Sequence, residues 1–500
     1  MYSKNKFAFL CLGMYWLLQN FSLTSCKDII KMATVRATYD ATGESWTDWV
    51  KRYIGVRDFT TRRRVGYKEY FWDEVIKHDK PEDCWIVVHG KVYDVTEWVP
   101  KHPGGKVIYD GAGGDCTGVW ESYHPLSVLD RGIPKKYLIG EIRDYNDFYS
   151  WDGTFYRKIK EKVEKAIPRN KRRDDQRMTI KGLCLLVSYF FALGLYIYFC
   201  NWWTAVVYGF FCSQIGVNIM HDGNHGAFTS SKTLTWIAGH TLELVGSSSV
   251  VYRRSHNYGH HSCVNHYELD RAFDTTYPLI RLHANQDRMW YHKYQHYYGW
   301  IIYTLVNFGD LFGTFDEFFW MSNFPNRRGS TSMSSFIFQV FVKLCWLFYA
   351  ILIPTYIHGY VNIFPVWLLY MLTFGVGYAL FFAVNHWTLD AGFVDNQNIS
   401  NTNWGVLQVE NSINFALDST FWTWLTGGLN YQIEHHLFPA MVHTRLPEIS
   451  SIVQEVCKEY GVTYFAYPSF WAALKGHYDL LKALGSYEKP QEAASFLKTK

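Results

Sequence analysis

The stretch FWTWLTGGLNYQIEHHLFP, residues 421–439, decides the fold because its polar end carries a Gln-x-x-His-His cluster next to an apolar run. Two further clusters match it, HDGNH at residues 221–225 and HNYGHH at residues 256–261. On a helix, residues four apart lie on one face, so the two histidines of the first cluster would stack one above the other. Together the clusters offer seven imidazoles and one amide. That is about what two six-coordinate metal ions need once oxygen ligands are added.

The candidate metal ligands are imidazoles and one amide, and none of the three clusters contains a cysteine. A single histidine is more often a hydrogen-bonded residue than a ligand, but three clusters favour metal binding. Without thiolates, a structural zinc site is not expected, and nitrogen ligands suit iron or another first-row metal. We therefore expect iron. The candidate ligands are His221, His225, His256, His260, His261, Gln432, His435 and His436.

These clusters resemble the histidine boxes of the membrane di-iron fatty-acid desaturases. In the third box, Gln432 replaces a first histidine, which resembles the front-end branch, whose members carry a fused cytochrome b5 domain. The resemblance implies a di-iron site built from the eight candidate ligands. The middle box departs from that branch, with three residues instead of two between its first histidines. On an α-helix, one added residue turns His256 by about 100° relative to the pair that follows.

The composition indicates a membrane protein. Of 500 residues, 48% are hydrophobic and 19% aromatic, which exceeds the usual values for soluble domains. The net charge of +4, without an arginine-rich repeat, gives no reason to expect nucleic acid as a partner. The ten cysteines include no Cys-x-x-Cys pair, which fits a reducing compartment. We expect the catalytic face to lie in the cytosol.

Residues 67–145 have the composition of a small soluble α+β domain, with short alternating strands such as WIVVHGKVYDVT at residues 85–96. The segment from 71 to 105, which ends in His-Pro-Gly-Gly, resembles cytochrome b5 nearly throughout. By that resemblance, His102 and His124 are the two axial ligands of a b-type haem. Two imidazoles fill both axial positions, close the iron to dioxygen and leave one-electron transfer as its task.

The N-terminal residues 1–31 carry Lys4 and Lys6 before an apolar run and could pass for a secretory signal. A signal would send the haem domain into the lumen, away from cytosolic reductants. Gln19 and Asn20 interrupt the run, so a stable spanning helix is not expected. We expect an extension of doubtful use, with Met32 as an alternative start, followed by a linker over residues 32–66.

Four apolar runs are each about long enough to span a bilayer: residues 181–200, 203–220, 336–357 and 363–384. Four crossings return the chain to the side it left, so the haem domain, the three boxes and the C-terminus share one face. The basic linker over residues 146–178 places that face in the cytosol. Residues 179–464 form the predicted desaturase domain, and residues 465–500 a C-terminal cytosolic tail. Residues 233–251 should lie in the membrane interface, with Arg253 and Arg254 at the headgroups.

The expected fold is an α+β cytochrome b5-like haem domain followed by a mainly α-helical multi-pass membrane desaturase domain, with about four transmembrane helices and a cytosolic cap of histidine boxes. In related desaturases, the region after the fourth helix supports the metal centre, which makes His386 a further candidate ligand. The resemblance extends to the insect cytochrome b5-related proteins.

An unactivated methylene cannot be deprotonated by a side chain, so an oxidant made from dioxygen is needed. The resemblance therefore implies a fatty-acyl desaturase of the endoplasmic reticulum membrane, acting on a lipid or acyl-CoA. Its electrons would come from a nicotinamide cofactor through a cytochrome b5 reductase and the fused haem. Because the middle box departs from the pattern, a sphingolipid desaturase or hydroxylase is the first alternative. A membrane-anchored haem electron-transfer protein without desaturase activity is the second, and the intact ligand set argues against it.

Overall fold

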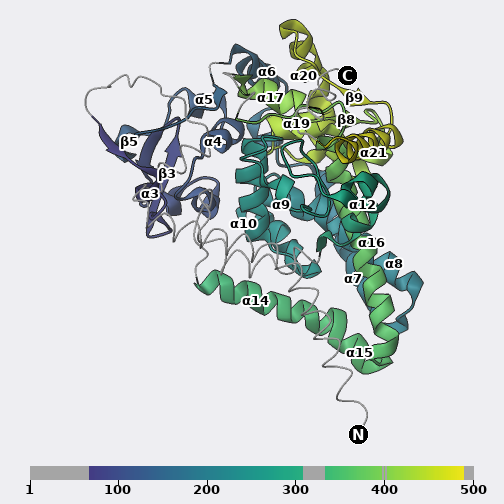
Figure 1. The fold of residues 1–500 in the computed structure, drawn as a ribbon. Helices are drawn as coiled ribbons and strands as arrows, with labels where there is room; N and C mark the ends of the chain where they lie inside the picture. The colour runs from purple at the N-terminus through teal and green to yellow at the C-terminus, as the bar shows by residue number, and fades with distance from the viewer. Residues whose placement is uncertain are drawn as a thin grey trace, which may run out of the picture. The chain divides into compact units, whose positions relative to one another are not determined.

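The computed structural model describes residues 67–151, 153–307, 333–396 and 402–488, together with Ile399 and Glu492. These residues fall in one compact unit that begins at Arg64. Both the expected N-terminal extension and the linker after it, residues 1–66, lie outside the described residues. Figure 1 follows the described chain from β1 to α21.

A five-stranded sheet forms the N-terminal domain, with strand order β1-β5-β4-β3-β2. Its strands are β1 (Lys68–Tyr70), β2 (Asp79–Lys80), β3 (Asp83–Val88), β4 (Lys91–Asp94) and β5 (Leu138–Ile142). The β3–β4 hairpin turns at His89 and Gly90, both with positive φ, as a two-residue turn that matches strand twist requires. β1 runs parallel to β5, whereas β3 pairs with β4, and β4 with β5, in the antiparallel sense.

Short helices cover this sheet and enclose its core. They are α3 (Trp72–Val75), η1 (Val99–Lys101), η2 (Gly105–Gly111), α4 (Thr117–Tyr123), α5 (Leu126–Leu129) and η3 (Lys135–Tyr137). Alternate residues of β3, namely Cys84, Ile86 and Val88, pack into the same cluster as Val99 and Ala112. The period-2 pattern of the strand therefore sets which side chains are buried. The predicted α+β domain is confirmed.

The segment expected to be a linker contains a packed helix. α6 (Thr154–Ala166) buries Phe155, Ile159 and Val163 in one cluster with residues of α20 (Leu446–Tyr460). Spacing of three to four residues puts these side chains on one face of α6, which explains why the helix docks. The chain between the two domains is therefore held against the second domain.

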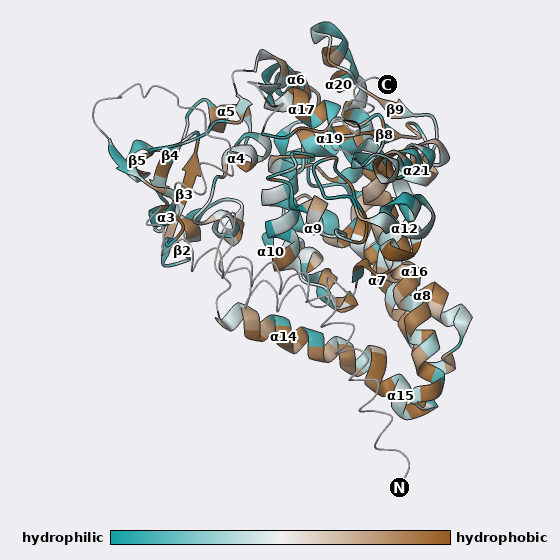
Figure 2. Ribbon diagram, viewed as in Figure 1, coloured by the Kyte–Doolittle hydropathy of each residue, from teal (hydrophilic) through white to brown (hydrophobic). Residues whose placement is uncertain are grey.

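Four helices are long and apolar enough to cross a membrane, by length and composition, over Arg169–Phe199, Trp202–Asn224, Met333–His358 and Tyr360–His386. The regular α-helices within them are α7 (Gln176–Phe199), α8 (Trp202–Gln214), α14 (Met333–Leu347), α15 (Ile353–His358) and α16 (Tyr360–His386). Figure 2 shows hydrophobic residues along most of their length. Side chains of Asp175 and Asn201 cap the first two helices. The four predicted helices are confirmed.

Small residues let the apolar helices pack closely. A Cβ at Gly209 of α8 would come within 2.5 Å of the Tyr370 carbonyl oxygen of α16. α12 (Gln295–Thr304) approaches α16 in the same way, at Gly375. Close backbone contact of this kind is how helices associate where water does not drive burial.

Shorter elements form the polar cap over these helices. They are α9 (His221–Asn224), α10 (Lys232–Gly239), η6 (His240–Val245), α11 (Ser249–Tyr252), α17 (Trp404–Glu410), α18 (Thr420–Leu425), α19 (Gln432–Leu437), α20 and α21 (Phe470–Ser486). Two strand pairs tie the cap together, β6 (Tyr149–Ser150) with β7 (Thr402–Asn403) and β8 (Asn414–Phe415) with β9 (Ala466–Tyr467).

Two parts of the cap differ from expectation. Arg253, expected to be free for the headgroups, pairs through its guanidinium with Asp110 of the N-terminal domain at 2.7 Å, and both side chains are largely buried. Within the expected C-terminal tail, α21 is a packed helix with Leu480, Leu481 and Leu484 fully buried. In both cases a tertiary contact, which sequence periodicity does not encode, fixes the position.

Candidate metal centre

Four histidines from three separate segments form a first group. Their ligand atoms lie within 4.8 Å of one another. His221 and His225 come from α9 and its C-cap, His256 from a π-helix, η7 (Arg253–Gly259), and His435 from α19. As expected from their i, i+4 spacing, His221 and His225 lie on one face, with ring centroids 4.7 Å apart in an edge-to-face arrangement.

Three further histidines, His260, His386 and His436, form a second group within the same 4.8 Å limit. The Nε2 atom of His386 lies 3.1 Å from Nε2 of His260 and 3.2 Å from Nε2 of His436. Metal–nitrogen bonds of about 2.1 Å at near right angles place neighbouring nitrogens about 3 Å apart. The spacing is therefore that of ligands around one ion.

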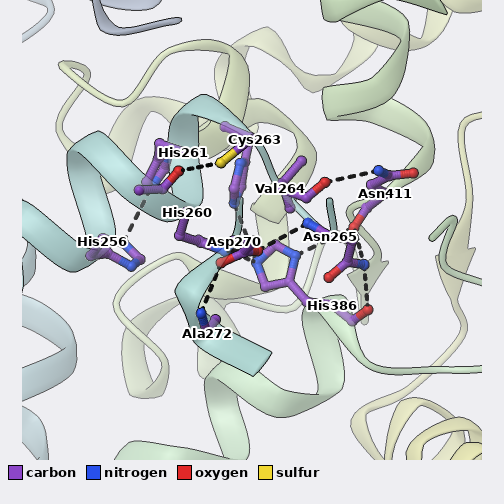
Figure 3. Close-up of polar contacts among 12 residues, drawn as sticks. His256, His260, His261, Cys263, Val264, Asn265, Asp270, Ala272, His386 and Asn411 are labelled. Atoms are coloured by element: carbon purple, nitrogen blue, oxygen red, sulfur yellow. Dashed lines mark hydrogen bonds and ion pairs between the residues drawn. The ribbon is translucent and has the colours of Figure 1, made fainter. Parts of the chain in front are cut away.

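The outer nitrogens of this second group are held by hydrogen bonds, and Figure 3 draws His260 and His386 with their surroundings. Nδ1 of His260 meets the Asp270 carboxylate at 2.8 Å, and Nδ1 of His386 meets the Asn411 carbonyl at 3.4 Å. Nδ1 of His436 meets the Gln408 amide oxygen at 2.9 Å. Since each acceptor requires a proton on Nδ1, all three Nε2 atoms carry lone pairs that face one another. A cation between them removes that repulsion.

Unpartnered nitrogens make the first group a candidate metal site as well. Both ring nitrogens of His221, and Nε2 of His225 and of His435, are buried without a hydrogen-bond partner among the described residues. A buried polar atom left this way is costly unless an ion or water completes it. Burial, and then the neighbouring imidazoles, hold the pKa of His225, His256 and His435 well below the usual range. These rings are therefore neutral and able to ligate a metal.

His261 and Gln432 join the two groups. Nε2 of His261 lies 3.1 Å from Nε2 of His256, and its ring stacks on His436 with centroids 4.2 Å apart. The side-chain amide of Gln432 lies 2.8 Å from Nε2 of His386. Rotating that amide by half a turn would present its oxygen to the second group. All eight predicted residues, and His386, are thus brought to one buried region.

The added residue of the middle box is absorbed by backbone geometry. η7 is a π-helix, whose hydrogen bonds span five residues instead of four. The wider turn lets His256 point to the first group while His260 points to the second. The rings of His256 and His260 nevertheless stay stacked, with centroids 5.4 Å apart. π-turns of this kind are frequent at functional sites.

A second site lies in the N-terminal domain between His102 and His124. Their ring centroids are 6.2 Å apart, about two metal–nitrogen bonds of roughly 2 Å each plus the ring radii. Nδ1 of His102 bonds the Gly105 carbonyl at 3.1 Å, and Nδ1 of His124 bonds the Trp120 carbonyl at 3.0 Å. Both Nε2 atoms are thereby left to ligate. Burial lowers the pKa of His124 to about 4 and also lowers that of His102.

Comparison with known proteins agrees with this arrangement. Residues 159–468 match the family model described as Fatty acid desaturase, and residues 71–143 match the Cytochrome b5-like Heme/Steroid binding domain. The chain is 36% identical over 454 residues to an acyl-lipid (8-3)-desaturase of Physcomitrium patens, covering 84% of this chain and 92% of that protein. The chain belongs to the fatty acid desaturase family. This desaturase is also 33% identical over 451 residues to acyl-lipid (8-3)-desaturase B of Dictyostelium discoideum, covering 84% and 95%.

The family match confirms the predicted family, fold class and enzyme class: this desaturase is an oxidoreductase with a fused cytochrome b5-like domain. Sequence reasoning missed the residues that support the ligands. Asp270, Gln408 and Asn411 hold Nδ1 atoms of the second group, as described above. Buried Glu434, inside the third box, bonds Tyr464 at 2.7 Å and Asn414 at 2.8 Å. The available signal was a polar residue within an apolar run, as for Gln408 in WGVLQVE.

Proposed function

We propose that this desaturase holds two iron ions, one in each histidine group, and inserts a double bond into the acyl chain of a membrane lipid. The observation that carries the proposal is the convergence of lone pairs in the second group, where His260, His386 and His436 each turn Nε2 inward while Nδ1 is occupied. Nitrogen donors without thiolates suit iron. The eight ligands are those expected from the boxes, with His386 as a ninth.

The side chains of the site provide geometry and a fixed protonation state. When bound, the iron pair supplies the oxidising power from dioxygen that an unactivated methylene requires. Asp270, Gln408 and the Asn411 carbonyl hold the rings of the second group in one tautomer. Burial lowers the pKa of His225, His256 and His435, so these rings need not lose a proton before they bind metal. The candidate ligands His221, His225 and His436 are themselves at most 2% exposed, which limits the access of bulk water to the centre.

The fused domain donates the electrons that dioxygen reduction requires. His102 and His124 would hold a b-type haem whose two filled axial positions restrict it to one-electron transfer. The haem must therefore be reduced twice in each turnover. A cytochrome b5 reductase that draws on a nicotinamide cofactor is the proposed source. Being part of the same chain, the haem is present at an effective concentration on the order of millimolar or more.

The proposed location is the endoplasmic reticulum membrane, with the cap and the haem domain in the cytosol. Basic residues before α7 support that orientation, because cytoplasmic flanks carry an excess of lysine and arginine. These residues are Arg169, Lys171, Arg172 and Arg173, at the start of the first candidate span and ahead of α7. The proposed substrate is an acyl-lipid, since both relatives described above are named as acyl-lipid desaturases.

Two measurements test this function. Metal analysis of the purified chain should give one haem and about two non-haem irons per chain, as the two sites imply. Lipid analysis of yeast that expresses the chain, with varied fatty acids and sphingoid bases in the medium, should show a new double bond in an acyl-lipid. The His260→Ala variant should keep the haem but lose non-haem iron and product.

Other outcomes of these measurements would contradict or replace the proposal. Iron equal only to haem, or zinc in place of non-haem iron, contradicts the proposal. A new hydroxyl group or a modified sphingoid base would replace acyl-lipid desaturation by the sphingolipid alternative. Product that appears equally with His260→Ala would belong to the host and not to this chain.

A further inference from the structure

The haem domain contacts the metal centre directly through Tyr123. This residue ends α4, and its hydroxyl lies 2.7 Å from Nδ1 of His225 in the first histidine group. The two residues are 102 positions apart in sequence, so only the docked domain brings them together. Nε2 of His225 has no hydrogen-bond partner among the described residues and is left for the metal.

The role of Tyr123 becomes clear by comparison with the residues that bond Nδ1 of the other ligand histidines. Nδ1 atoms of His260, His386 and His436 are held by Asp270, Asn411 and Gln408, as shown above. All three partners lie within the residues that match the desaturase family model, 159–468. Nδ1 of His225 is held by a residue within the cytochrome b5-like match, 71–143. When Nε2 ligates a metal, Nδ1 carries the proton and donates it to the phenolic oxygen of Tyr123.

Tyr123 is also covalently joined to the haem site, because the next residue is His124. The peptide bond between the two residues therefore links the phenol of Tyr123 to the imidazole of His124 through the backbone. An electron leaving the haem through His124 thus meets covalent bonds and a single hydrogen bond before the ring of His225. Electron transfer falls steeply across gaps in space, so a bonded route of this kind is favoured.

Further contacts hold the domain in this position. Arg253 pairs with Asp110 at 2.7 Å, and the hydroxyl of Tyr258 donates to the Val107 carbonyl at 2.5 Å. A Cβ on Gly118 of α4 would lie 2.8 Å from Cα of Ser262. Arg253 and Tyr258 belong to η7, the π-helix of the middle box. The docking surface is therefore continuous with the segment that carries metal ligands.

We propose that Tyr123 is a positioning residue through which the haem domain completes the metal centre: its phenolic oxygen orients His225, and its bond to His124 makes it the route for electrons. The inference rests on the proposed function of the two sites. In each transfer one electron leaves the ferrous haem, which becomes ferric, and reduces the metal centre by one electron. Tyr123 keeps its proton and is neither oxidised nor reduced overall.

The test uses the full chain with haem and iron bound and the variant Tyr123→Phe, which removes only the hydroxyl. Under anaerobic conditions, with the metal centre oxidised, the haem is reduced by a laser-flash photoreductant. Its reoxidation is followed in the Soret band. We expect reoxidation to slow by about 10-fold or more in the variant, or the ratio of non-haem iron to haem to fall by a similar factor. The haem spectrum, haem potential and melting temperature should not change.

A matched control is Tyr145→Phe, which removes another phenolic hydrogen bond of the same domain, to Asp115 at 3.0 Å. It should leave both readouts unchanged. If Tyr123→Phe reoxidises its haem at the wild-type rate and keeps its iron, the inference is overturned. If the wild-type haem itself gives no electron to the metal centre, the proposed function fails instead. The two failures are thus distinguishable.

Discussion

The Asp270 carboxylate offers a sharp test of how the second histidine group is held. Both of its oxygens accept hydrogen bonds: Oδ2 from Nδ1 of His260 at 2.8 Å and from the Asn265 amide at 3.0 Å, and Oδ1 from the Ala272 amide at 3.0 Å (Figure 3). The carboxylate is fully buried. In Asp270→Asn, whichever way the amide turns, its NH2 group faces a donor. The variant therefore changes the hydrogen bonding with almost no change in shape.

The expected loss can be worked out from these contacts. If the new NH2 group faces His260, the proton on Nδ1 loses its acceptor and the imidazole loses its preferred tautomer. A buried hydrogen bond to a charged group contributes about 1.5–3 kcal/mol. Each 1.4 kcal/mol is about tenfold in a binding constant. Iron affinity should therefore fall by about 10 to 100-fold, the range typical of residues that hold a metal-bound histidine.

The assay is the ratio of non-haem iron to haem after dialysis of the purified full chain against a graded series of chelator concentrations. Haem serves as an internal standard because Asp270 lies outside the haem domain. The control Asp479→Asn removes a partly exposed carboxylate that pairs with the exposed Lys475 on α21, and it should titrate like the wild type. If Asp270→Asn kept its iron at every chelator concentration, with normal activity, the carboxylate would not be holding a metal ligand.

Three further predictions concern the two sites. His102→Ala should abolish the haem spectrum and turnover while leaving non-haem iron bound; turnover that persists without any separate cytochrome would show that the fused domain is not the donor. Gln432→Ala should lower iron affinity or activity by about 10 to 100-fold, measured by iron content and product. Unchanged values would show that Gln432 neither ligates the metal nor supports a ligand. Because burial lowers the pKa of His124 to about 4 from an ordinary 6.5, the unfolded chain takes up a proton first as the pH falls. The haem domain should therefore lose up to about 3 kcal/mol between pH 6.5 and pH 4, seen as loss of the Soret band and a falling melting temperature; a flat profile over that range would contradict the burial argument.

Most of the fold could be predicted from local sequence, because apolar length and strand alternation are local properties. The four membrane-spanning helices and the β3–β4 hairpin are of this kind. The histidine boxes could also be recognised from sequence, since imidazoles clustered at helical spacing are typical of metal sites. The packing of α6 and α21, in segments expected as linker and tail, could not be predicted, because their apolar faces reveal a partner only once the fold is known.

The residues that support the ligands could not be predicted from the sequence, for the same reason. Asp270 meets His260 ten positions away around an irregular turn, whereas Gln408 meets His436 across 28 residues. Neither contact leaves a periodic signal. The π-helix of the middle box was missed because an added residue in a helix is first taken as a rotation, and only the backbone shows that the turn has widened to hold it.

The docking of α4 against the middle box also bears on competition within the membrane. With Gly118 against Ser262 and Asp110 paired with Arg253, the face of η7 that meets the haem domain is already occupied. To reach that face, a freely diffusing cytochrome would have to displace the haem domain. If electrons enter the metal centre at this surface, the rate of turnover depends on how quickly the fused haem is reduced and not on the amount of free cytochrome in the membrane.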